Sequence, residues 1–159
     1  MKLEESYLRA RALPQHRQQF LDEVELGEYS RYVSKARYAT KGSVLEIALK
    51  ETGGMANYQW NPLGLFFKGI KSLIAVDERP FLILDNVSDF MNILLYHEGE
   101  HARQRFENPR SLTKQKELME ALAWQNQLKN LDPRCSYWYK EAVCSKAIEL
   151  VINVHNRQI

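Results

Sequence analysis

The sequence has few of the features that direct a chain to a membrane or to a nucleic acid. Its 159 residues hold no apolar run close to the roughly 18 residues that a membrane-spanning helix needs. Lys and Arg total 22 against 20 Asp and Glu, so the formal net charge is only +2. That balance gives no electrostatic reason to bind nucleic acid or an acidic membrane surface. We therefore expect neither among its partners.

Cysteine is scarce as well. Cys135 and Cys144 lie in a segment expected to be helical, where nine residues span about 13 Å, too far for a disulfide. Residues 1–11 alternate charged with apolar side chains and lack the apolar core of a secretory signal. These features predict reduced thiols and a cytoplasmic location.

Neither repeats nor low-complexity segments interrupt the chain. Apolar residues make up 45% and charged residues 26%, which is ordinary for a globular protein and argues against a disordered or disulfide-dense chain. The length suits a single domain over residues 1–159.

The pattern of apolar residues predicts a mainly helical α+β fold. We expect the first 14 residues to be loosely ordered and helices to follow at 16–26, 43–50, 88–106, 113–130 and 136–154. Short apolar runs at 72–76 and 81–84, separated by four polar or turn-forming residues, predict an antiparallel hairpin. Since a lone hairpin is marginally stable, this small antiparallel sheet should pack against the helix at 88–106.

That helix carries His97-Glu98-Gly99-Glu100-His101, the pattern H-E-x-x-H. Residues four apart share a helix face, so the two imidazoles can bind one metal ion. Glu98 is then placed to take a proton from a metal-bound water. With 4 histidines in the chain, chance gives about 0.01 matches. Gly99 costs about 1 kcal/mol relative to Ala in mid-helix, which favours a site needing room near the metal.

A catalytic zinc site needs a third protein ligand and one open position. The next expected helix offers Glu117 and Glu120, both beside apolar residues. Carboxylates in apolar surroundings are expensive to bury without a cation. The residues themselves leave the choice between these two glutamates open.

The motif, together with Glu120-Ala121 on a later helix, resembles the gluzincin class of zinc metallopeptidases, and in particular its minimal single-domain members. The resemblance implies that His97, His101 and Glu120 bind Zn²⁺, that Glu98 is the general base, and that the substrate is a peptide or protein. It implies a zincin-like core at 68–130, whose sheet edge would align an extended peptide. Residues 1–67 would be a helical N-terminal region of unassigned role, and 131–159 a C-terminal helix.

The chain departs from the gluzincin pattern at one supporting position. Many members carry an Asp four residues after the ligand glutamate, which orients a ligand histidine. Here that position is Trp124. The candidates to replace the Asp are Gln125, Glu117 and Asp89.

The sequence also leaves open which residue would stabilise an oxyanion; the candidates are Tyr137, Tyr139 and His155. Two alternatives to an active peptidase follow. The chain is either a zinc-stabilised binding or regulatory domain with a zincin fold and little activity, or a metal-free helical interaction module. The substrate's identity and the oligomeric state stay open.

Overall fold

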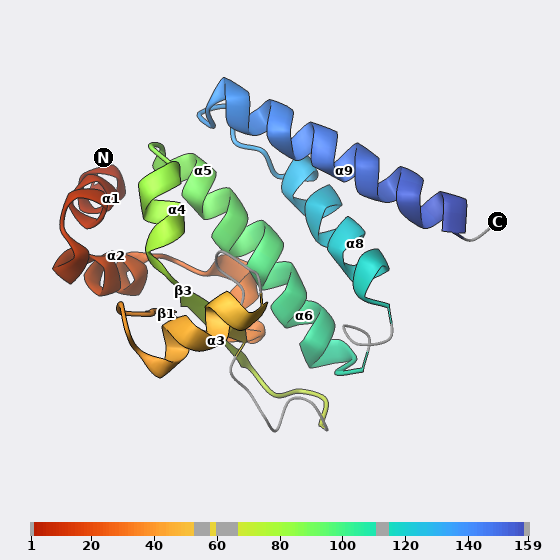
Figure 1. Cartoon of the computed structure of the whole chain (residues 1–159), viewed down its shortest axis with the longest axis horizontal. Coiled ribbons are helices and arrows are strands. Elements are labelled where there is room, and N and C mark those ends of the chain that lie inside the picture. Colours follow the sequence, from red (N-terminus) through yellow and green to blue (C-terminus); the bar gives the residue numbers. More distant parts are fainter. Residues whose placement is uncertain (1, 53–57, 60–66, 111–114, 158–159) are drawn as a thin grey trace.

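A computed structural model describes residues 2–52, 58–59, 67–110 and 115–157. One long helix, built from α5 (Val87–Met91), η4 (Asn92–Glu98) and α6 (Gly99–Glu107), runs through the middle of the molecule. The N-terminal helices and a small sheet lie on one side of it in Figure 1, and α8 (Lys116–Lys129) and α9 (Tyr137–Arg157) lie on the other. The expected C-terminal helices are therefore present, although residues 113–114 fall outside the described part.

The N-terminus is helical, so the expectation of a loosely ordered segment is wrong. α1 (Lys2–Ala12) has Glu4 and Glu5 in its first turn and Arg9 and Arg11 in its last, which favours the helix dipole at both ends. Its residues Tyr7 and Ala10 are buried. A 3₁₀ turn, η1 (Pro14–His16), leads to α2 (Arg17–Glu23), and η2 (Gly27–Arg31) leads to the sheet.

The predicted antiparallel hairpin is wrong. β3 (Ser72–Val76) is a strand, but residues 81–84 are not: Phe81 to Ile83 belong to α4 (Glu78–Ile83), and Leu84 follows it. The reason is Asp77, whose carboxylate accepts a hydrogen bond from the Arg79 backbone N–H and so caps a new helix. Pro80 fits this first turn, where its missing N–H is harmless.

The sheet is built mainly from a parallel pair. β1 (Val33–Tyr38) pairs with β3 in parallel, from Val33 opposite Ser72 to Tyr38 opposite Val76. The two-residue β2 (Tyr58–Gln59) pairs antiparallel with the other side of β3, giving the order β1-β3-β2. The connection between β1 and β3 includes α3 (Val44–Thr52), as a parallel pair requires a crossover.

An aromatic cluster joins the N-terminal segment to the long helix. The rings of Tyr7, Phe20, Phe81 and Phe90 lie with centroids 4.9–6.0 Å apart, and all four side chains are buried. The Tyr7 hydroxyl donates to the Leu84 carbonyl at 2.6 Å, so the one polar atom of that ring is satisfied. Residues 2–38 thus belong to the same core as the helix that carries the histidine motif.

In the described part of the chain, each helix is too short or too polar to cross a bilayer. Cys135 is buried and Cys144 is half-buried, and both are free thiols. Cys135 lies just before α9, and Cys144 lies within it.

Candidate metal centre

The histidine motif lies where the long helix changes its hydrogen-bonding pattern. η4 is a π-helical segment, and its last bond runs from the Gly99 N–H to the Leu94 carbonyl, five residues back. Such segments are rare in helices and occur often at functional sites. The π-helical segment ends at Glu98, so His97 and His101 lie on opposite sides of the transition.

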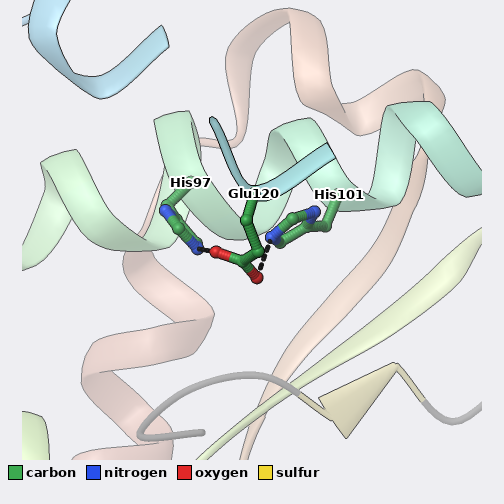
Figure 2. Close-up of side chains that lie close together, drawn as sticks. All are labelled: His97, His101 and Glu120. Atoms are coloured by element: carbon green, nitrogen blue, oxygen red, sulfur yellow. Dashed lines mark hydrogen bonds and ion pairs between the residues drawn. The ribbon is translucent and has the colours of Figure 1, made fainter. Parts of the chain in front are cut away.

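His97, His101 and Glu120 converge between the long helix and α8. Figure 2 shows both imidazoles pointing from the helix toward the carboxylate of Glu120. His101 Nε2 lies 3.0 Å from Glu120 Oε1, and His97 Nε2 lies 3.4 Å from Oε2. Both histidines are buried, whereas the Glu120 side chain is 31% exposed. The group is therefore shielded by the helices and reached from solvent past Glu120.

The spacing of the ligand atoms suits a tetrahedral ion. Two atoms each about 2.0–2.1 Å from a common zinc at a tetrahedral angle are about 3.3 Å apart. The nitrogen–oxygen distances of 3.0 and 3.4 Å, each to a different oxygen of the Glu120 carboxylate, are close to that value. Among the described residues, this is the one group of three or more His, Cys, Asp or Glu side chains with metal-binding spacing, its ligand atoms within 4.8 Å of one another.

A chain of side-chain amides fixes the orientation of His97. Asn92 Nδ2 donates to the backbone carbonyls of Gln127 and Asn130, so its oxygen faces the interior. That oxygen accepts from Gln127 Nε2 at 3.1 Å and from the Tyr139 hydroxyl at 2.8 Å. Gln127 Nε2 also donates to Tyr139, so Gln127 Oε1 must face His97 Nδ1, at 2.6 Å.

His101 is held in the same way over a shorter path. Gln104 Nε2 donates to the Met119 backbone carbonyl at 3.1 Å, which turns Gln104 Oε1 toward His101 Nδ1 at 2.8 Å. Both Gln oxygens are acceptors only, so each histidine carries its proton on Nδ1. Both Nε2 lone pairs are thereby directed at the Glu120 carboxylate.

This arrangement needs a positive charge at its centre. With Nδ1 protonated, a neutral histidine presents a lone pair at Nε2, and two such lone pairs face carboxylate oxygens. Burial is the main reason that the pKa of His97 is lowered, so a proton on His97 is a poor source of that charge. Burial alone would raise the pKa of Glu120, but an Nε2–H of His101 or His97 facing the carboxylate holds that pKa well below the ordinary value, so the carboxylate favours a cation at this position. A metal ion held by all three residues would supply this charge.

Glu98 is buried on the same helix, with 3% of its surface exposed. Burial raises its pKa well above the ordinary value, and the negative charge of Glu120 raises it further. A carboxyl group in these surroundings favours the protonated form until a cation binds nearby. This is the setting in which a glutamate can accept a proton and later release it.

The structure separates the two glutamates that the sequence left open. Glu117 is exposed and forms an ion pair with Arg157 at the end of α9, whereas Glu120 meets both histidines. Trp124, one turn beyond Glu120, packs its ring edge-on against His97 with centroids 5.1 Å apart.

The suggested replacements for the missing Asp lie elsewhere. Gln125 lines a separate cavity together with Tyr29 and Arg103. Asp89 is buried and accepts from the backbone N–H and hydroxyl of Ser136, where it caps α9. The supporting roles belong to Gln127 and Gln104, which the sequence-based candidates did not include. Their positions in the sequence could have indicated this role. Gln127 is seven residues after Glu120, and Gln104 is three after His101, so each glutamine lies on the same helix face as a metal-binding candidate.

The three candidates for stabilising an oxyanion do not lie at the metal group. Tyr139 is buried, and its hydroxyl is committed to Asn92 and Gln127. Tyr137 is 76% exposed at the start of α9, and His155 is exposed near its end. Tyr139 therefore supports His97, and the other two belong to the outer surface.

Gly99 serves a packing contact rather than the metal. A Cβ atom at this position would lie 2.7 Å from Cδ1 of Tyr29, closer than real contacts allow. Tyr29 comes from η2, and its hydroxyl accepts a hydrogen bond from Asn126 Nδ2 on α8. The absent side chain thus lets η2 pack directly on the motif helix.

Comparison with known proteins gives no relative. No protein-family model, curated protein or solved structure matches the chain.

Proposed function

We propose that this chain is a zinc-dependent metallopeptidase. The observation that carries the proposal is the group of His97, His101 and Glu120, with both Nε2 lone pairs directed at a carboxylate. Three protein ligands with a solvent-accessible side are the pattern of catalytic zinc sites, whereas structural sites use four. The resemblance of the H-E-x-x-H motif and Glu120-Ala121 to the gluzincins supports a peptide or protein as substrate.

The chemistry of the donor atoms favours zinc. Two imidazole nitrogens and one carboxylate oxygen suit Zn²⁺, whereas Mg²⁺ and Ca²⁺ prefer sites made of oxygen alone. Gln127 and Gln104 add the supporting hydrogen bonds that orient metal-binding histidines. His97, His101 and Glu120 would hold the ion.

Glu98 is the residue that moves protons in this proposal. Bound zinc would supply a Lewis acid that lowers the pKa of water. Glu98 would take up the proton that the attacking water loses and would deliver it to the leaving amine. Burial of Glu98 next to Glu120 raises its pKa, which makes uptake of the proton from water favourable.

The test compares wild type with Glu98→Gln. Both proteins should bind about one zinc per chain, since Glu98 is not among the metal-binding residues. Wild type should cleave unfolded casein or a peptide library, and Glu98→Gln should lose at least 100-fold in rate, a typical effect of removing a general base. A variant of Glu98 that cleaves as fast as wild type would contradict the role of this residue.

One observation favours a second function, a zinc-stabilised binding or regulatory domain. Tyr139, the candidate oxyanion donor nearest the ligands in the hydrogen-bond network, is already used to orient Gln127. Under this function wild type would bind zinc and leave every peptide intact, so the same assay distinguishes the two.

A cytoplasmic location is part of the proposal, supported by the free thiols of Cys135 and Cys144.

A further inference from the structure

α9 has apolar side chains on two opposite faces. One face carries Tyr139, Val143 and Ala147, which are buried. The opposite face carries Ile148 and Ile152, which are 54% and 51% exposed. An ordinary surface helix keeps its apolar residues on one side, so the second apolar face needs an explanation.

The exposed face forms a continuous stripe along the helix. At about 100° per residue, Glu141, Cys144, Ile148, Ile152 and His155 all lie within about 40° of the direction of Ile148. We call these five residues the outer stripe. Tyr139 points in the opposite direction, and Val143 lies about 140° away. Figure 1 shows α9 at one edge of the molecule, with α8 along its inner side.

The spacing of the residues in the outer stripe is the same whether it is counted from its first residue or from its last. Its spacing is three, four, four and three residues, with Ile148 at the centre. If a second copy of α9 lies antiparallel across this stripe, Ile148 meets Ile148 and Cys144 meets Ile152. Glu141 of each copy then lies against His155 of the other, where an imidazole N–H faces a carboxylate. A two-fold axis requires this self-complementary pattern.

We propose that the chain forms a homodimer through antiparallel pairing of the outer stripes of two α9 helices. The positions of Glu141 and His155 favour a second copy of this helix as the partner, in the antiparallel direction. A parallel pairing would place Glu141 against Glu141, which is unfavourable, whereas the antiparallel one joins Glu141 to His155 at both ends. The contact is about 21 Å long and one helix wide. It is small beside the about 1,600 Å² of a standard interface, so the dimer dissociates on dilution.

The proposal does not depend on zinc or on peptidase activity, and its test uses the full chain. Sedimentation equilibrium over a concentration series should show a monomer–dimer equilibrium. Ile148→Glu should weaken association at least tenfold, with melting temperature and zinc content unchanged because Ile148 lies outside the core. Glu141→Lys should weaken the dimer, and Glu141→Lys combined with His155→Glu should restore it.

Crosslinking then tests the geometry. In a Cys144→Ser background, Ile148→Cys should form a covalent dimer on mild oxidation, because the two β carbons meet on the axis. Glu149→Cys is the matched control: it is equally exposed but lies about 100° around the helix. A chain that stays monomeric up to its solubility limit overturns the proposal. So does a dimer that Ile148→Glu leaves intact, or one in which the control crosslinks as readily as Ile148→Cys.

Discussion

Gln127→Met is the sharpest test of how the metal centre is oriented. Gln127 accepts from His97 Nδ1 and donates to Asn92 and Tyr139, all within the buried network. Methionine keeps most of the volume and removes the acceptor. Without metal, His97 can respond by moving its proton to Nε2 and donating to Glu120, 3.4 Å away. Metal binding prevents this change of tautomer, because the ion needs the Nε2 lone pair.

The loss should therefore fall mainly on the metal-bound state. A buried N–H left without an acceptor costs about 1–3 kcal/mol. Loss of a hydrogen bond that supports a ligand histidine typically weakens metal binding about 10–100-fold, equivalent to about 1.4–2.7 kcal/mol. The two figures agree, so we expect the zinc dissociation constant of Gln127→Met to rise about 10–100-fold.

Competition with a chromophoric chelator measures this dissociation constant directly. Gln125→Met is the matched control, since Gln125 lies on the same helix and faces a separate cavity. The control should bind zinc as tightly as wild type. If Gln127→Met also binds within twofold of wild type, the argument that Gln127 fixes the proton on His97 Nδ1 is refuted.

Three further outcomes follow. Zinc present at about 1,000 times its dissociation constant stabilises the fold by about 4 kcal/mol, so chelation should lower the melting temperature by about 10 °C; an unchanged value would exclude a bound metal. Gly99→Ala forces a Cβ to 2.7 Å from Tyr29 and should destabilise by about 1–3 kcal/mol in chemical denaturation while zinc content persists; full stability would mean that the ring moves aside freely. Because the pKa of Glu98 is raised in the folded state, this group's contribution to folding stability is fully present below pH 4.5 and is lost as the pH rises through the folded-state pKa. Glu98→Gln should therefore melt higher than wild type at pH 7, both metal-free, with the gain gone near pH 4; a gain that is equal at both pH values would contradict this.

Sequence reasoning predicted the part of the site that depends on contacts within one helix or between consecutive helices. Four-residue spacing on one helix brings His97 and His101 together, and the next helix returns to bring Glu120 to them. The histidine pair and a glutamate from the next helix follow from helical geometry and from two helices packing side by side, whereas the choice of Glu120 over Glu117 came from the gluzincin resemblance. Metal identity and reaction stay predictions of the motif and its donor atoms.

The parts that sequence reasoning missed depend on contacts between distant segments. The partner of β3 is β1, more than 30 residues earlier, and no local pattern specifies a parallel pair. The polar run after β3 was interpreted as a turn, although Asp77 followed by Arg79 and Pro80 also fits a capped helix start. The orientation of Gln127 depends on Asn92 and on Tyr139 from another helix, so only the folded arrangement shows its role.

The π-helical segment has a consequence for how such a site can arise. Phe90, before this segment, lies in the aromatic core, whereas His97, near its end, and His101, after it, point toward Glu120 of α8. One residue more or fewer in this stretch would turn the two halves of the helix relative to each other by about 100°. Inserting a single codon in an ordinary helix therefore changes the direction in which all later side chains point. Deleting one residue between positions 92 and 96 should turn His97 and His101 by the same angle in the opposite sense.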